Sequence, residues 1–520
     1  METCSTLLRY YHTPNHRHAL TLDVDICIFG GNSGGIIAAI AAKRKGLSVA
    51  LLEPGYHLGG LTAGGLGYTD IGNKFAIGGL AREFYRRIGL KYNQPELWRF
   101  EPSAAEAVYR EWLDEQGIEC YLESFLESVE TAGGKIVSLS TENGIKVKAR
   151  QFIDATYEGD LMAQSGVSYT VGRESNSVYG ETWNGQQLLR KHQFEYDVDP
   201  YRIKGRPSSG LLPGINEGSY EQGAGDRCVQ AYNFRLCMTN DPARRIPFSE
   251  PEHYNRDDYE LCARYCRAGH IPSLRKFDAL INSIYDVNNW GAISTDYVGM
   301  NHDFPDADYA TREKIFQSHV QWTKGLLWFW STDPSVDENF RRQLREFGWP
   351  EDQFPETENF SHSLYVREAR RMVSDLVMNE HHCTGRLRVE DPVGLAAYTM
   401  DSHNCRRIVI DGKVLNEGDV QIHSGPPYPI SYRSIIPSRG EISNLLVPFC
   451  LSASHIAFGS IRMEPVFMIL SESAVEAASL AIEHKFDLQD IPYERLKKRL
   501  LDAQQVIHPV PKVKNTQTGE

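Results

Sequence analysis

The amino-acid sequence predicts an α/β fold with a parallel sheet at its centre. The main observation is the run from Asp23 to Glu53, in which a short apolar segment, a glycine-rich turn, a helix-forming segment and a second apolar segment follow one another. A second observation is the length of 520 residues, which is enough for two or three domains with large cores. The third is an ordinary globular composition, 41% hydrophobic and 24% charged.

The elements of this run have the order of a dinucleotide-binding unit. Val24, Ile26 and Ile28 predict a short buried strand, residues 36–45 a helix of small residues, and residues 47–52 a second buried strand. The turn between the first strand and the helix contains Gly30, Gly31, Asn32, Ser33 and Gly35. Glycine permits the tight turn and close packing of helix on strand, and the free amides of the helix N-terminus bind a pyrophosphate.

Glu53 ends the second strand, where an acid accepts hydrogen bonds from the adenosine ribose hydroxyls. Asn32 occupies the position of the middle glycine of a G-x-G-x-x-G motif. Asparagine tolerates positive φ better than most residues, so we expect the turn to form, with its backbone less close to the phosphate. The sequence therefore predicts a dinucleotide site between Gly30 and Glu53.

Three later segments resemble parts of one known flavoprotein fold. The stretch from Pro54 to Gly67 is a second glycine-rich segment, and its Gly59-Gly60-Leu61 resembles the Gly-Gly pair of the glutathione-reductase type, which lines the flavin site. A helix over 100–113 is expected to follow. The segment 152–160 resembles the strand that returns to the cofactor, although its usual A-T-G ending is here Ala-Thr-Tyr. A strand at 444–448 and a small-residue helix at 466–482 resemble the C-terminal segment that completes the site.

Together these blocks resemble the large family of FAD-dependent oxidoreductases whose bacterial members are often labelled xanthan-lyase-like. The resemblance extends to DATYEGDLMAQSGVSYTVGRES, LYVREARRM, YTMDSHNCRR and SASHIAFGSIRMEP, and so covers most of residues 22–505. It implies FAD as cofactor and a Rossmann-like FAD-binding domain of glutathione-reductase type. The residues expected at the cofactor are Gly30, Gly31, Asn32, Ser33, Gly35, Glu53, Gly59, Gly60, Leu61, Asp154, Ala155, Thr156, Arg462, Glu464 and Pro465.

The cofactor blocks are separated by a long insertion, so the FAD-binding domain is expected to be discontinuous and to carry an inserted α+β substrate domain. Helices are expected within the insertion near 306–332, 336–346 and 361–380. The predicted parts are an N-terminal arm at 1–21, the FAD-binding domain at 22–170 and 431–485, the substrate domain at 171–430, and a C-terminal helix and tail at 486–520.

Two features suggest that an organic substrate reduces the flavin. No C-x-x-x-x-C pair follows Glu53, and the one candidate for a second nucleotide-binding turn, residues 223–225, has no buried strand before it. We expect hydride removal from a small polar molecule such as a sugar, a polyol or a secondary metabolite, with dioxygen or another molecule as electron acceptor. A redox-neutral isomerase or lyase is an alternative, and an NAD-binding protein is a third.

Histidine suits the base that takes the substrate proton, because its reference pKa of ~6.5 lies near working pH. His455 is preferred, since it precedes Arg462, which should stabilise the reduced flavin; His403 stands beside Asp401. His57 lies near the expected flavin pocket, where even a covalent bond to flavin is conceivable. A structural role is the alternative for each histidine. Arg367, expected to share a helix face with Arg371, could clamp an anionic or polyhydroxylated group or form salt bridges.

No metal site is expected, because neither Cys262 with Cys266 nor the triplet 381–383 supplies four well-spaced ligands. A net charge of −13 argues against nucleic acid or an anionic membrane as partner. No apolar stretch is expected to approach the ~20 residues that cross a bilayer. Ten scattered cysteines are typical of reduced thiols in the cytoplasm, and homo-oligomerisation is left open.

Overall fold

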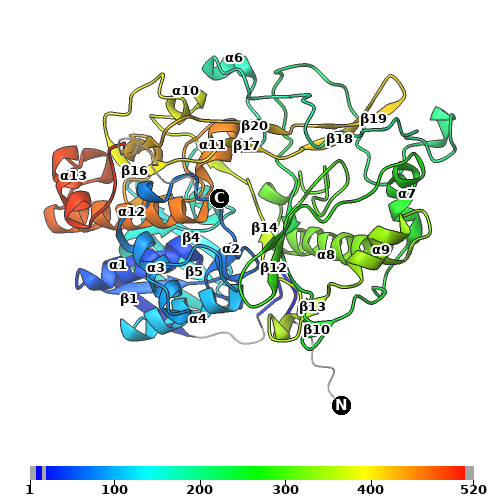
Figure 1. Cartoon of the computed structure of the whole chain (residues 1–520). Helices are drawn as coiled ribbons and strands as arrows, with labels where there is room; N and C mark the ends of the chain where they lie inside the picture. The colour runs from blue at the N-terminus through cyan, green and yellow to red at the C-terminus, as the bar shows by residue number, and fades with distance from the viewer. Residues whose placement is uncertain (1–6, 15–18, 510–520) are drawn as a thin grey trace, which may run out of the picture.

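A computed structural model describes residues 7–14 and 19–509. Parts of the predicted N-terminal arm and the predicted tail beyond residue 509 lie outside these residues. The chain forms two lobes that lie side by side (Figure 1). The first lobe contains the central sheet and the helices that cover it; the second contains the long helix α8 and several short antiparallel strand pairs.

The central sheet has the strand order β3-β2-β1-β6-β5-β4. The short strand β22 pairs with the carboxyl end of β6, beyond the part of β6 that pairs with β5. Its strands are β1 (Leu20–Phe29), β2 (Val49–Leu52), β3 (Cys120–Tyr121), β4 (Leu126–Ala132), β5 (Lys135–Thr141), β6 (Ile145–Asp154) and β22 (Leu445–Leu446). The pairs β3–β2, β2–β1, β1–β6 and β6–β22 are parallel, whereas the pairs β6–β5 and β5–β4 are antiparallel. Segments distant in sequence thus share one sheet, as expected for a discontinuous α/β domain.

Both faces of β1 are buried from Ile26 to Phe29, which explains the apolar sequence of this half of the strand. Ile26 and Ile28 belong to the core under the helices, whereas Cys27 and Phe29 face a second core on the other side of the sheet. The covering helices are α1 (Ser33–Arg44), α3 (Gly79–Lys91), α4 (Pro102–Glu115) and α12 (Glu464–His484). The predicted strand, turn, helix and strand between residues 23 and 53 are therefore confirmed, as is the helix predicted over 100–113.

Helix α12 corrects one expectation. Its 21 residues are long and apolar enough to cross a membrane by length and composition, so the prediction that no stretch approaches this length was wrong. Its residues from Glu464 to Ile482 are buried, and the helix packs along α1, with further contacts to α3 and β16. Its apolar character is explained by its place in the core, because a helix surrounded by protein on every side is hydrophobic all round.

The second lobe confirms two of the three helices predicted in the insertion. Helices α8 (Tyr309–Thr332) and α9 (Glu338–Leu344) lie where the pattern placed them. The helix predicted over 361–380 is wrong, because this segment holds only β14 (Leu364–Tyr365), β15 (Arg371–Met372) and the start of α10 (Glu380–Cys383), joined by irregular chain. The buried charged side chains of this segment pair with acids from distant segments, and these tertiary contacts override its helical pattern.

The remaining helices are α2 (Gly60–Ala63), α5 (Asp160–Gln164), α6 (Asn176–Tyr179), α7 (Glu260–Arg267), α11 (His455–Ile461) and α13 (Tyr493–Asp502). The remaining strands are β7 (Tyr169–Thr170), β8 (Asn233–Phe234), β9 (Leu236–Thr239), β10 (Arg245–Ile246), β11 (Phe277–Ala279), β12 (Ile284–Val287), β13 (Trp349–Pro350), β16 (Pro392–Ala396), β17 (Met400–Ser402), β18 (Arg406–Ile410), β19 (Lys413–Glu417), β20 (Val420–Ile422) and β21 (Tyr428–Ser431). Helix α13 coincides with the predicted C-terminal helix.

Candidate functional site

Three adjoining cavities run from the carboxyl ends of β1 and β2 into the second lobe. The first is lined by residues of the glycine turn, Glu53 and Gly60. The second shares Tyr157 and Val366 with the first, and the third shares Tyr365 with the second. Because neighbouring cavities share wall residues, they lie side by side. Open α/β sheets bind their ligands at this edge, outside the carboxyl ends of the strands.

The glycine turn brings helix α1 very close to strand β1. A Cβ atom added to Gly35 would lie 1.8 Å from the carbonyl oxygen of Gly30, so only glycine fits there. Gly30 itself has φ +110°, and its own added Cβ would lie 2.6 Å from the Ala155 oxygen. The turn forms as expected, but Asn32 has φ −69°, so its tolerance of positive φ is not used. Its amide nitrogen donates instead to the Ala155 carbonyl at 2.8 Å, which joins the turn to the end of β6.

The N-terminus of α1 is available to an anion, because no side chain caps it. The first amides of a helix have no intrahelical partner, and the helix dipole favours negative charge there. Glu53 accepts hydrogen bonds from the amides of Gly31 at 2.6 Å and Gly55 at 2.7 Å. Burial raises the pKa of Glu53 to about 7. An uncapped helix end beside a buried acid has the donors and acceptors that the diphosphate and ribose of a dinucleotide require.

One buried carboxylate joins the predicted cofactor segments. Glu464, the first residue of α12, accepts from Ser33 Oγ at 2.5 Å, Thr62 Oγ1 at 2.7 Å and the Tyr157 hydroxyl at 2.7 Å. The Tyr157 hydroxyl in turn accepts from the Leu61 amide at 2.9 Å. Burial raises the pKa of Glu464, and its three donors oppose that shift. Sequence reasoning missed Thr62 and Tyr157; the replacement of glycine by tyrosine in Ala-Thr-Tyr was the available signal for Tyr157.

A family model for FAD-dependent oxidoreductases matches residues 25–500 of the chain. The chain belongs to this family. Its cofactor is FAD, and the glycine turn, the uncapped helix and Glu53 fit the adenosine diphosphate half of that molecule. No curated protein matches the chain.

Solved structures similar to parts of the oxidoreductase are flavoenzymes. A flavin-containing monooxygenase from Stenotrophomonas maltophilia is 16% identical, with a TM-score of 0.20, over 30% of this chain and 43% of that chain. An L-amino acid deaminase from Proteus vulgaris is 17% identical, with a TM-score of 0.24, over 35% of this chain and 57% of that one. An L-proline dehydrogenase from P. horikoshii is 14% identical, with a TM-score of 0.25, over 30% and 59%. The oxidoreductase thus matches about half the length of these structures.

Some of the other residues expected at the cofactor line the first cavity, whereas others hold the backbone around it. Gly30, Asn32, Gly60 and Thr156 line the first cavity. Asp154 is buried and accepts from Thr156 and from the Met162 amide at 2.9 Å, so its carboxylate holds the end of β6 rather than facing a cavity. Gly59 has φ +90° and donates to the Gly31 carbonyl at 2.8 Å. Pro465 stands in the first turn of α12, where its missing amide proton costs nothing.

Arg462 is a buried cation at the second cavity. Its guanidinium donates to the Tyr365 hydroxyl at 2.6 Å and to the Asp401 backbone oxygen at 3.1 Å, and it lies 3.3 Å from the Asp401 carboxylate. Although burial disfavours the charge, its surroundings raise the pKa of Arg462, with Tyr365 and Asp401 as the main contributors. Arg462 thus lines the second cavity, and its position beside the flavin stays a prediction.

His403 lies in the wall of the third cavity between two acids. Its Nδ1 is 2.8 Å from Asp296 Oδ2, and its Nε2 is 3.4 Å from Asp401 Oδ2. Burial opposes charge on both acids, but nearby cations keep the pKa of Asp296 and of Asp401 below the usual range. Asp296 had no sequence signal, because it lies 107 positions before His403.

His455 has a different environment. It is 1% exposed, its Nδ1 lies 2.8 Å from Glu368 and its Nε2 lies 2.9 Å from Ser402 Oγ. Both ring nitrogens of His455 are paired, as they are in His403, but unlike His403 it lies in the wall of none of the three cavities. Its catalytic role stays a prediction, and the geometry favours His403.

Arg367 lines the second cavity, but not from a helix as expected. It pairs with Asp296 at 2.9 Å and donates to Asn233 at 3.1 Å. Arg371 pairs with Glu174 at 2.7 Å. Both arginines thus make the salt bridges that were the alternative to a substrate clamp.

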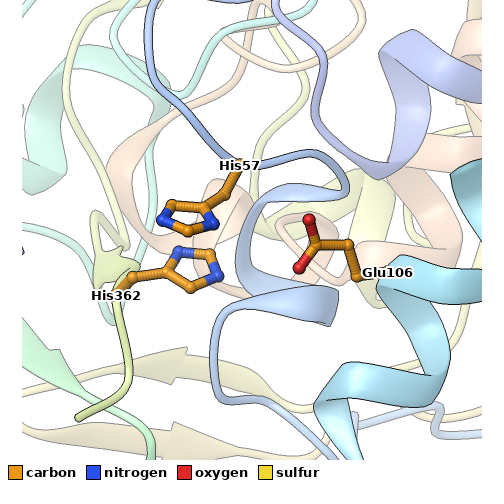
Figure 2. A group of neighbouring side chains, drawn as sticks. All are labelled: His57, Glu106 and His362. Atoms are coloured by element: carbon orange, nitrogen blue, oxygen red, sulfur yellow. The ribbon is translucent and has the colours of Figure 1, made fainter. Parts of the chain in front are cut away.

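His57 lies in the wall of the first cavity and stacks on His362, with ring centroids 3.8 Å apart (Figure 2). Figure 2 shows the Glu106 carboxylate facing the edges of both rings. Burial lowers the pKa of both histidines, so both are neutral near pH 7. The potential ligand atoms of the trio lie within 4.8 Å of one another, whereas ligands of a four-coordinate zinc are about 3.3 Å apart. We interpret the two histidines as a polar wall of the first cavity, with the Glu106 carboxylate beside them.

The other two clusters that the sequence offered as metal ligands, the cysteine pair and the triplet 381–383, have roles in packing and helix capping. Cys262 and Cys266 are buried on α7 in the core of the second lobe. In the triplet 381–383, His382 completes a capping box with Asn379 at the start of α10. These contacts account for both clusters without a metal.

Proposed function

We propose that the oxidoreductase removes hydride from a small polar organic molecule bound in the third cavity, with FAD bound along the first and second. When bound, FAD would supply the hydride acceptor. The observation that carries the proposal is that the cavities are adjacent: Tyr365 belongs to the walls of both the second and the third. A substrate in the third cavity would therefore lie next to the flavin end of the cofactor site.

The walls of the third cavity support a polyhydroxylated substrate such as a sugar or polyol derivative. They combine carboxylates, amides, cations and aromatic rings, so a bound molecule meets hydrogen-bonding groups on most sides. The wall residues that carry these groups are Asp70, Lys191, Arg235, Lys276, Asn288, Asn289, Trp290, Tyr398, Asp401 and His403. Arg235 is neutralised by Asp286 at 2.8 Å, which leaves no strong preference for an anion at that point.

His403 is the proposed base. With Asp296 on Nδ1 orienting the ring, its Nε2 would take the proton from the substrate heteroatom as hydride leaves, and the carboxylates of Asp296 and Asp401 would stabilise the protonated form. Arg462 would place a fixed positive charge where negative charge accumulates during hydride transfer. His455, held by Glu368 and Ser402, would instead position the chain that carries Ser402 and His403.

Anaerobic mixing of the holoenzyme with a panel of sugars, polyols and hydroxy or amino compounds tests this function. A substrate should bleach the visible flavin absorbance, and His403→Ala should retain FAD but slow bleaching by ~10²-fold or more. His455→Ala is the control and should slow the bleaching much less than His403→Ala does. Slow bleaching in His455→Ala with a parental rate in His403→Ala would contradict the assignment. Product formation without lasting bleaching would favour the redox-neutral isomerase or lyase.

We also propose that the enzyme works in the cytoplasm. In support, the nine cysteines within the described residues are all free thiols, as is usual where glutathione keeps thiols reduced.

A further inference from the structure

We propose that residues 7–14, here called the strap, form part of the FAD site: they close over its adenosine end and set the rate at which FAD leaves. The strap precedes β1 and is separate in sequence from the glycine turn and from Glu53, the acid at the end of β2. Its residues nevertheless reach the cofactor cavity, because Arg9 and Tyr10 line it together with Glu53 and Tyr56. Since Glu53 marks the ribose position, this wall lies at the adenosine end.

The strap is attached on one side to the second lobe. The amides of Tyr10 and Tyr11 donate to the same carboxylate oxygen of Glu313, at 2.7 and 2.9 Å. The Leu8 carbonyl accepts from Gln317 at 2.9 Å, and the Leu8 side chain is buried in the core of that lobe. Glu313 and Gln317 are one turn apart on α8, so the strap is held along that helix.

On the other side the strap is attached to the first lobe. His12 lies 2.6 Å from Glu123 and stacks on the Tyr56 ring, with centroids 4.7 Å apart. Tyr11 packs edge-on against Phe125, and its hydroxyl donates to Glu142 at 2.9 Å. The strap therefore joins the two lobes directly beside the cavity (Figure 1).

This arrangement has a kinetic consequence for the cofactor. The wall made by Arg9 and Tyr10 must move if the adenosine end is to leave on that side, and such movement breaks the two hydrogen bonds to Glu313. Hydrogen bonds to a charged acceptor are stronger than those between neutral groups, so their removal should change the opening equilibrium about tenfold or more.

The test measures FAD release from the holoenzyme, following the rise of FAD fluorescence after dilution. Glu313→Ala removes the acceptor of the strap amides, and Glu313 is not itself a residue of the cavity wall. We expect release about tenfold faster or more, with the same change in a chain that lacks residues 1–14. Lys314→Ala, an exposed neighbour on α8, is the matched control and should release FAD at the parental rate. A parental release rate in Glu313→Ala would overturn the proposal.

A second measurement uses the unmodified chain, so it is independent of how the variants fold. Trypsin cuts after arginine, and bound FAD should slow cleavage of the Arg9–Tyr10 bond because both residues line the cofactor cavity. The apoprotein should be cut there several-fold faster than the holoenzyme, at equal rates of cleavage elsewhere. Equal cleavage of this bond with and without FAD would also overturn the proposal.

Discussion

Replacement of Gly35 by alanine should abolish tight FAD binding while leaving a folded chain. The added Cβ would lie 1.8 Å from the Gly30 carbonyl oxygen, whereas ordinary van der Waals contact begins at 3.4 Å. Helix α1 and strand β1 would have to separate by roughly 1.5 Å to relieve this clash. Both elements are buried, and the obstacle is backbone, so neither side can rotate away. Overpacking of this kind typically costs about 1–3 kcal/mol.

The same displacement moves the N-terminal amides of α1 away from the diphosphate position. Distance-dependent hydrogen bonds weaken steeply over such a shift, so FAD content should fall by ~10-fold or more at equal protein concentration. The assay is the ratio of flavin to protein absorbance after gel filtration, with circular dichroism to verify folding. Gly46→Ala is the matched control at the other end of α1, where nothing lies within 4 Å. Because Gly46 has φ +75°, alanine there should cost about 1–2 kcal/mol of stability. The substitution leaves the glycine turn at the other end of α1 unchanged, so FAD should be retained. A Gly35→Ala protein with full FAD content would refute the reasoning.

Three further predictions concern charge and metal. Glu472→Gln should flatten the pH dependence of the unfolding free energy: burial raises the pKa of Glu472 from 4.5 to about 8, so this carboxyl stabilises the fold fully below pH 4.5 and progressively less as pH rises through 8. Denaturant titrations from pH 5 to 8 measure this, and parallel curves for the two proteins would contradict it. Arg462→Gln should make the flavin midpoint potential more negative, because a buried cation stabilises the reduced form; an unchanged potential in spectroelectrochemistry would place the flavin elsewhere. Prolonged dialysis against EDTA should leave FAD content and melting temperature unchanged if His57 and His362 are a polar wall with Glu106 beside them, whereas a loss restored by Zn²⁺ would identify the three as a metal site.

The cofactor turn could be predicted from sequence because its determinants are local. Gly35 and Glu53 belong to one continuous strand–turn–helix–strand unit, in which glycine is required by a short contact within the unit itself. The same locality explains why α8 and α9 were predicted close to their observed bounds. The segment 361–380 was not predictable in this way, because its arginines are held by Asp296, Asp160 and Glu174, which come from other parts of the chain.

The sequence by itself determined the α/β class, the order of the dinucleotide-binding elements and, through family resemblance, the cofactor. Only the tertiary structure decided which histidine reaches a cavity: His403 and His455 stand in equally suggestive motifs, but one meets Asp296 at the wall of the third cavity while the other is enclosed by Glu368 and Ser402. Only the tertiary structure placed the strap beside Glu53. The physical reason is that backbone geometry and periodicity act over a few residues, whereas burial and hydrogen-bond partners are set by packing between segments hundreds of residues apart.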